Sequence, residues 1–132
     1  MPPALTSAYL LEIFPHFPVE FRTMLEDYLS GKVTAINSGI FNKATAGLSP
    51  FARDVLKATC AIPFGHTATY SDIACAIGKP GAVRAVGAAL NRNPLPVLIP
   101  CHRVLAKNGI GGYAYGLDIK RRLLKFEGLD FF

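Results

Sequence analysis

Long apolar runs are missing from this chain of 132 residues. The longest, from Pro94 to Pro100, falls far short of the roughly 20 residues that a membrane-spanning helix needs. The first residues also lack the basic and apolar regions of a secretory signal. We therefore expect a soluble globular protein in a reducing compartment. Its length has room for one compact domain, or for a small domain with a short appended lobe.

Cysteine is scarce as well. Three cysteines, Cys60, Cys75 and Cys101, are an odd number whose spacing fits neither a disulfide framework nor the CxxC pairs of a zinc site. We expect free thiols, with Cys60 and Cys75 as small buried side chains within helices. Cys60, His66 and Cys75 are an alternative zinc site, but they form no recognised ligand set.

Charge is distributed unevenly along the chain. Residues 1–50 carry three basic and four acidic side chains, a net charge of −1, whereas residues 51–132 carry eleven basic and five acidic ones, a net charge of +6. A basic part of this kind fits binding to a polyanion such as nucleic acid, although a well-solvated surface would look similar.

The first third of the chain has weak structural signals. Residues 1–30 place apolar side chains at helical spacing, interrupted by two prolines and ended by Gly31. This predicts a small helical or mixed lobe. Residues 32–48 predict a loose connection with one short strand near Val33, Ala35 and Ile36. No repeat or low-complexity tract is present.

Sharper signals begin at Ser49, a helix N-cap candidate that predicts a helix over residues 50–61. A second helix, capped by Ser71, is expected to end at Gly78, and a third covers residues 82–90 after a Gly/Pro turn. Two short helices joined by such a turn are typical of a helix-turn-helix. Small helix pairs are common, however, and most bind nothing.

The last third combines a strand, a loop and a helix. Residues 95–99 predict a buried strand, residues 111–116 a glycine-rich loop, and residues 117–127 an amphipathic helix ended by Gly128. The helix side chains expected to face inward are Leu123, Leu124 and Phe126.

Cys101 and His102 are neighbours just after the expected strand. A nucleophilic cysteine needs a base or a positive neighbour to form the reactive thiolate. Adjacent residues of a strand point to opposite faces, so contact between the two requires a bend or a bridging water. Glu127 is the candidate carboxylate to orient the imidazole. Taken alone, the pair more often means a buried cysteine beside a surface histidine.

A longer set of motifs changes that interpretation. Pro-Cys-His-Arg-Val at residues 100–104 is the most specific of them. The others are Arg84–Ala89, Asn93-Pro94, Gly112-Tyr113 and the helix residues from Lys120 to Gly128. Together they make residues 49–128 closely resemble, in register throughout, the O6-alkylguanine-DNA alkyltransferases.

The resemblance implies an α/β fold, mostly α in its C-terminal part. It implies a winged-helix-like helix-turn-helix domain for DNA binding and catalysis over residues 49–132, with an abbreviated N-terminal lobe over residues 1–48. The family usually carries a larger, ribonuclease-H-like N-terminal lobe. We expect its shortness to affect stability more than chemistry, because every residue given a chemical role lies in the matching part.

The resemblance also implies a set of catalytic roles. Cys101 is the alkyl acceptor, His102 acts through a water as its base, Glu127 holds the imidazole, and Asn93 braces the turn before the cysteine. We further expect Cys101 to have a lowered pKa that depends on Glu127.

A second set of residues would handle the DNA and the target base. Tyr70 crowds the phosphate and drives rotation of the nucleotide, and Arg84 enters the stack in place of the extruded base. Tyr113 lines the base pocket, the backbone N–H of Ala114 sits near O6, and Val104 belongs to the same set. Ala114 lacks the hydroxyl often found at its position, but the backbone donor remains.

The implied activity is DNA repair by a suicide methyltransferase. An alkyl group on O6 of a paired guanine lies inside the stack, so the nucleotide must be flipped out before Cys101 can reach it. The thioether product has no easy route to hydrolysis, so each molecule acts once. The expected partner is double-stranded DNA containing O6-alkylguanine, bound by a monomer through the minor groove with little sequence preference. We expect no cofactor, metal or membrane, and a location with DNA in the cytoplasm or, in a eukaryote, the nucleus.

Three alternatives remain on sequence alone. Alkyltransferase-like proteins bind the lesion and flag it for excision, but commonly have tryptophan where this chain has Cys101. A helix-turn-helix regulator would bind a specific sequence without damage. A cysteine hydrolase using Cys101 and His102 would turn over many times and would leave Tyr70 and Arg84 unexplained.

Overall fold

Short helices make up most of the structure, a computed structural model that describes residues 3–32 and 35–130. In chain order the elements are α1 (Ser7–Ile13), η1 (Val19–Phe21), α2 (Arg22–Leu29), α3 (Ser38–Ala44), α4 (Pro50–Cys60), β1 (Ala68–Thr69), α5 (Tyr70–Ala76), α6 (Val83–Leu90), η2 (Cys101–Arg103), β2 (Val104–Leu105) and α7 (Leu117–Phe126). This largely helical α/β composition confirms the predicted fold class.

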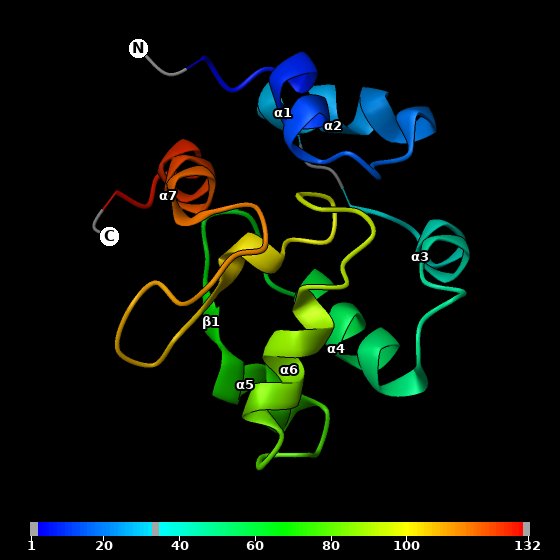
Figure 1. Ribbon diagram of the computed structural model, residues 1–132, viewed down its shortest axis with the longest axis vertical. Helices are drawn as coiled ribbons and strands as arrows, with labels where there is room; N and C mark the ends of the chain where they lie inside the picture. The colour runs from blue at the N-terminus through cyan, green and yellow to red at the C-terminus, as the bar shows by residue number, and fades with distance from the viewer. Residues whose placement is uncertain (1–2, 33–34, 131–132) are drawn as a thin grey trace.

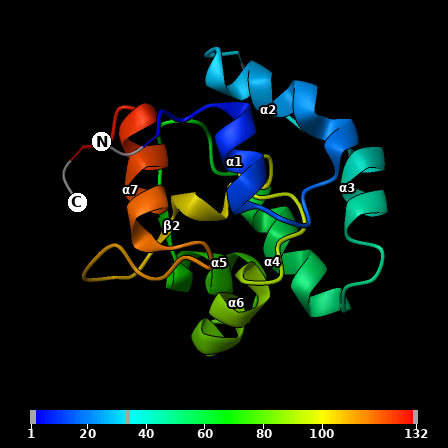
Figure 2. The ribbon, with the colours of Figure 1, turned by 45° about the horizontal axis from the view of Figure 1, so that its top comes forward.

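The elements divide between two ends of the molecule. Helices α1 and α2 lie at one end near α7, and α4, α5 and α6 pack together at the other, with α3 beside α4 (Figures 1 and 2). Between the two ends, β1 and β2 pair in parallel, with Ala68 opposite Val104 and Thr69 opposite Leu105. This pairing joins the start of α5 to the segment that follows η2, so the turn with Cys101 lies at the centre.

The helices from α4 to α6 follow local sequence signals. The Ser49 hydroxyl accepts a hydrogen bond from the Ala52 amide at 3.2 Å and begins α4, as predicted. Helix α5 begins two residues earlier than expected, because Thr69 is its N-cap and not Ser71. Thr69 and Asp72 exchange side-chain and backbone hydrogen bonds of 2.9 and 3.0 Å, a capping box that satisfies two free amides at once.

The strand predicted over residues 95–99 is wrong, although the segment is buried. The Ile99 amide donates to the Leu95 carbonyl at 2.8 Å, which closes a tight turn. Prolines 94, 96 and 100 have no N–H to donate to a strand ladder. Val97 has a φ of 76°, a conformation that costs a β-branched residue roughly 1–3 kcal/mol and persists where packing holds it. Its side chain is only 2% exposed.

Of the other local predictions, some are confirmed and some are wrong. The helical character of the first 30 residues and the stop at Gly31, which has a φ of 82°, are confirmed. The short strand expected near Ala35 and Ile36 is absent, since these residues lie in no helix or strand, and Val33 lies outside the described residues. Helix α3 follows them where a loose connection was expected, and Asn37 caps it by accepting from the Ile40 amide at 2.8 Å. Cys75 is exposed, not buried.

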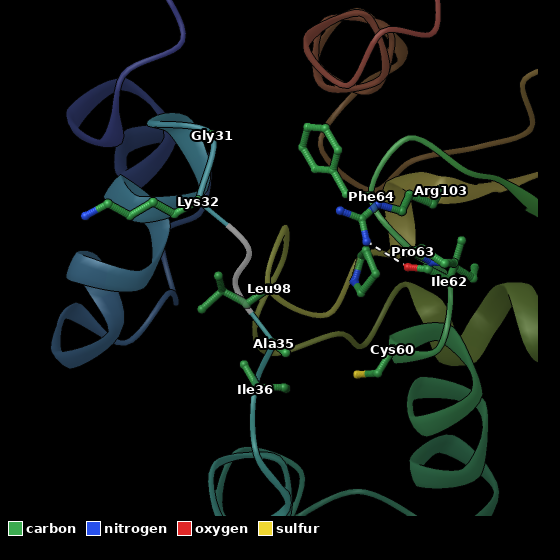
Figure 3. Close-up of a pocket in the computed structure, with 11 residues that line it drawn as sticks. Gly31, Lys32, Ala35, Ile36, Cys60, Ile62, Pro63, Phe64, Leu98 and Arg103 are labelled. Atoms are coloured by element: carbon green, nitrogen blue, oxygen red, sulfur yellow. Dashed lines mark hydrogen bonds between the residues drawn. The ribbon is translucent and has the colours of Figure 1, made fainter.

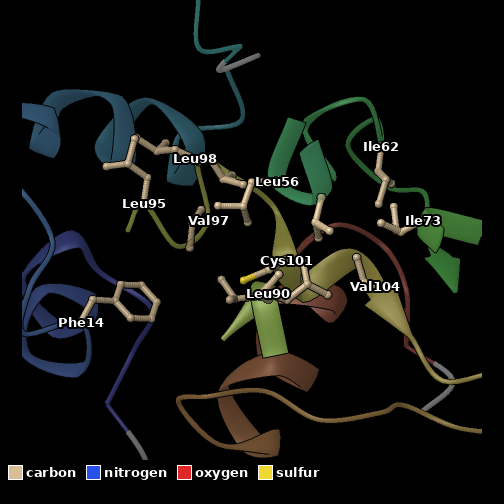
Figure 4. Packing of buried hydrophobic residues seen from close by; sticks show 14 of the residues in the cluster. Phe14, Leu56, Ile62, Ile73, Leu90, Leu95, Val97, Leu98, Cys101 and Val104 are labelled. Carbon is tan, nitrogen blue, oxygen red and sulfur yellow. The ribbon is translucent and has the colours of Figure 1, made fainter. Parts of the chain in front are cut away.

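One hydrophobic core runs through both ends of the molecule. Figure 4 shows the Cys101 sulfur among apolar side chains that include Leu90 and Val97, with Phe14, the residue just after α1, to one side. In α7, Leu123 and Leu124 face inward as predicted, but Phe126 is 37% exposed because it lies at the helix end. None of the helices within residues 3–32 and 35–130 is long and apolar enough to cross a membrane.

Candidate active site

Cys101 is the first residue of the η2 turn, and its side chain is only 7% exposed. The Asn93 side-chain amide donates to the Cys101 sulfur at 3.1 Å and to the Ile99 carbonyl at 2.7 Å. The oxygen of the same amide accepts from the Leu95 backbone at 2.9 Å. Asn93 thus connects both ends of the tight turn to the thiol and holds the sulfur in place.

A cavity of about 340 Å³ reaches the Cys101 sulfur. This volume lies within the usual range of small-molecule sites, about 300–1,000 Å³. Its other lining residues are Tyr70, Gly87, Leu90, Asn91, Gly112, Tyr113, Ala114 and Tyr115. The cavity therefore lies between α6 and the glycine-rich loop, with the thiol in its wall.

His102 and Glu127 form a buried pair behind the cysteine. The two side chains are fully buried, and His102 Nε2 lies 2.6 Å from Glu127 Oε2. The carboxylate can only accept hydrogen bonds, so Nε2 carries the proton of the neutral ring. His102 Nδ1 is then the acceptor, and it is buried with no hydrogen-bond partner among the described residues.

Four further hydrogen bonds converge on the Glu127 carboxylate. Arg103 donates from Nε to Oε1 at 2.8 Å and from its second terminal nitrogen to Oε2 at 3.2 Å. The Gly65 amide donates to Oε1 at 2.9 Å, and the Tyr28 hydroxyl donates to Oε2 at 2.6 Å. Arg103 also donates to the Ile62 carbonyl at 2.8 Å, as Figure 3 shows.

These contacts determine the charges at neutral pH. Burial alone would raise the pKa of Glu127, but the hydrogen bonds from His102, Arg103 and Gly65 outweigh it and lower this pKa to about 2. Burial lowers the pKa of His102 more than the neighbouring carboxylate raises it. At pH 7, Glu127 is therefore ionised and His102 is neutral, able to accept a proton.

The lowered pKa expected for Cys101 is wrong. Burial raises the pKa of this thiol, and the hydrogen bond from Asn93 and the charge of Lys120 offset burial only in part. The resting side chain is thus the protonated thiol, and a base has to remove its proton before the sulfur can react.

Two residues hold the glycine-rich loop against the rest of the site. The Lys120 ammonium is buried and donates to the carbonyls of Val104 at 2.7 Å and Gly112 at 2.8 Å, and burial lowers its pKa to about 8. The Tyr70 hydroxyl accepts from the Gly112 amide at 3.0 Å. Gly111, with a φ of 75°, lies so close that a Cβ there would meet the Tyr70 hydroxyl at 2.8 Å.

The sequence of this chain is similar to sequences of known methylated-DNA–protein-cysteine methyltransferases. The sequence model described as "6-O-methylguanine DNA methyltransferase, DNA binding domain" matches residues 50–129, more than half of the chain. The chain belongs to the 6-O-methylguanine DNA methyltransferase family. A curated relative, the methylated-DNA–protein-cysteine methyltransferase of Methanosarcina barkeri, is 50% identical over 109 residues, which are 82% of this chain and 66% of the relative. The chain thus spans slightly under two thirds of that relative.

Two solved structures have the same fold. The O6-methylguanine-DNA methyltransferase of Pyrococcus kodakaraensis has a TM-score of 0.72 and 30% identity, covering 92% of this chain and 78% of the other. The OGT of Mycobacterium tuberculosis, solved in complex with DNA, has a TM-score of 0.68 and 36% identity, covering 80% and 63%. Both likenesses support the predicted fold class.

The family's expected site residues are only partly gathered at the cavity. Tyr70, Tyr113 and Ala114 line it together with Cys101. Arg84 is exposed on α6 and Val104 is buried in β2, and neither lines the cavity. Val104 instead presents its carbonyl to Lys120.

Sequence reasoning missed three contributors to the site. Tyr28, Arg103 and Gly65 all donate to Glu127, yet the sequence analysis gave none of them a chemical role. Arg103 lies within the Pro-Cys-His-Arg-Val motif, which was the available signal; the other two have no local signature. The alternative zinc site is not formed: among the described residues, no group of three or more metal-ligating side chains comes together. Cys60 lines a second cavity, of about 230 Å³, together with Arg103 (Figure 3).

Proposed function

We propose that this protein repairs alkylated DNA by transferring the alkyl group from O6 of guanine to the sulfur of Cys101, once per molecule. The observation that carries the proposal is a buried thiol in the wall of a cavity of about 340 Å³, with a histidine oriented by Glu127 as its neighbour in the chain. Family membership and the printed activity of the Methanosarcina barkeri relative support it. Residues 49–132 would be the catalytic part, and residues 1–48 an N-terminal lobe.

The first chemical step is proton removal. Glu127 holds the proton of His102 on Nε2, which leaves Nδ1 to accept the proton of the Cys101 thiol through a bridging water. The thiolate then attacks the alkyl carbon. The carbon–O6 bond breaks, a carbon–sulfur bond forms, and the leaving guanine takes up one proton in exchange for the proton that the thiol lost.

The transfer should occur only once per molecule. A thioether has no easy route to hydrolysis, and Cys101 is the sole thiol that lines the cavity. The N–H of Ala114 is the donor that we assign to O6, and the ring of Tyr113 is the wall against the base. No cofactor takes part in this scheme.

Duplex DNA containing O6-alkylguanine is the proposed partner. Helix α6 presents mainly Gly and Ala beside Arg84, which favours shallow docking in the minor groove over readout of base edges in the major groove. Arg84, exposed on α6, would fill the gap left by the flipped guanine, and Tyr70 would crowd its phosphate. We propose that one monomer acts on each lesion, wherever the cell keeps its DNA.

Intact-protein mass spectrometry after incubation with duplex DNA carrying one O6-methylguanine tests the proposal. We expect one added methyl group per protein, located on Cys101, and no further reaction with excess DNA. Cys101→Ser should bind the DNA without gaining mass, while Cys75→Ser, at an exposed cysteine outside the cavity, should react like the unmodified protein. Binding without any transfer would identify an alkyltransferase-like lesion-binding protein, and repeated turnover would identify a hydrolase.

A further inference from the structure

Tyr28 lies in α2, 99 residues before Glu127 in the chain and outside residues 50–129, which the sequence model of the DNA-binding domain matches. Its side chain is only 1% exposed. Its side chain contacts Phe64, Phe126, His102 and Glu127, all of which follow residue 50 in the chain. Tyr28 therefore brings helix α2 into direct contact with Glu127 and His102.

The Tyr28 hydroxyl donates to Glu127 Oε2 at 2.6 Å. That oxygen is the same atom that accepts from His102 Nε2, also at 2.6 Å. These two bonds are the shortest that Oε2 accepts, because its third bond, from Arg103, is 3.2 Å long. The position of the hydroxyl thus helps to determine where the carboxylate can accept the imidazole N–H.

Aromatic rings enclose this contact. The Tyr28 ring packs against Phe64, with centroids 5.9 Å apart, and against Phe126, with centroids 5.2 Å apart. Those two rings also contact each other at 6.2 Å, and each is partly exposed to solvent. The three rings thus pack together beside Glu127, whose side chain is fully buried.

From this geometry we infer that Tyr28 is a positioning residue for the alkyl transfer: through Glu127 it orients His102, and it makes the N-terminal helices part of the catalytic machinery. The inference rests on the proposed function for its kinetic consequence, although the contact to His102 can be tested without DNA. It also revises the expectation that the N-terminal lobe matters for stability more than for chemistry.

Removing the hydroxyl has two opposed effects on His102. The carboxylate loses one of its anchors, so the imidazole is held less firmly and proton transfer from Cys101 is slower. More of the negative charge on Oε2 is then available to His102, so the pKa of His102 rises. The other charged groups that face His102 are Arg103 and Lys120, and both remain unchanged.

Tyr28→Phe is the decisive variant, because it removes the hydroxyl and keeps the ring. Leu25→Val is its matched control, one turn earlier in α2, fully buried and without polar contacts, and it weakens the packing of the same helix. The measurements are urea unfolding, the pH titration of His102 by NMR, and the rate of methyl transfer from duplex DNA. The chain has only three histidines, which makes the His102 signal assignable.

We expect Tyr28→Phe to move the His102 titration to higher pH and to slow transfer about three- to tenfold, since a hydrogen bond to a charged group accounts for about one tenfold factor. Leu25→Val should lower stability and leave the titration and the rate unchanged. An unchanged His102 titration in Tyr28→Phe would overturn the inference, as would equal slowing in both variants. If the protein transfers no methyl group at all, the proposed function fails, while the titration still decides whether Tyr28 acts on His102.

Discussion

Replacing Glu127 by Gln should strongly destabilise the fold, although the two side chains have nearly the same size. The carboxylate accepts five hydrogen bonds from Tyr28, His102, Gly65 and Arg103. An amide has one acceptor oxygen, and its NH2 group would face donors that have no other partner. Breaking a buried ion pair from one side costs about 3–5 kcal/mol, which is the loss that we expect at pH 7.

The pH dependence of this loss can be worked out from the pKa of Glu127. The fold lowers this pKa to about 2 from an ordinary value of 4.5, so the stabilisation is present above pH 4.5 and is lost as the pH falls toward 2. By linkage, the unmodified protein loses about 1 kcal/mol by pH 4 and about 2 kcal/mol by pH 3 from this group. The Gln variant has no carboxyl here, so the difference between the two proteins should shrink by those amounts.

Urea unfolding followed by circular dichroism, at pH 7, 4 and 3, measures both quantities in one series. A matched exposed substitution, Glu20→Gln, controls for the general effect of removing a negative charge. A loss below 1 kcal/mol at pH 7, or a loss that is the same at all three pH values, would refute the reasoning. It would mean that the hydrogen bonds to Glu127 contribute little to the fold.

Two further variants test other parts of the site. Arg84→Ala should slow repair of duplex DNA far more than reaction with free O6-benzylguanine, which needs no flipping; equal losses on both substrates would assign Arg84 to the pocket or the fold. Gly111→Ala should lower the free energy of unfolding by about 2 kcal/mol or more and slow transfer, because the φ of 75° and the 2.8 Å approach of the Tyr70 hydroxyl leave no room for a Cβ. Gly109→Ala, in the same loop but with open space around the Cβ, should change stability by less than about 0.5 kcal/mol, and similar losses in the two variants would contradict this account.

The parts of the fold that sequence could predict are those with local causes. Ser49 and the breaker at Gly78 mark helix boundaries within a few residues, and the structure confirms both. The Ser71 cap was an avoidable error, because Asp72 stands three residues after Thr69 and completes a capping box there. The local signal was present and was assigned to the wrong residue.

Three other errors have tertiary causes. The backbone of Val97 takes its conformation from the packing around it, so an apolar run that suggests a strand folds into a turn. The pKa of Cys101 depends on how deeply the sulfur is buried, which the motif does not encode. The bond from Tyr28 to Glu127 joins two ends of the chain, and no pattern in the sequence predicts it.

The burial of Cys101 also affects how readily its thiol reacts before any DNA binds. A molecule that reacts once is lost by any stray encounter of its cysteine with an oxidant or an electrophile, and such encounters require the thiolate. At Cys101 the raised pKa keeps the proton on sulfur, and the surrounding side chains leave little of the atom in contact with water. If the protein acts as we propose, low reactivity of Cys101 in the absence of DNA preserves its single equivalent of acceptor until a flipped base fills the cavity.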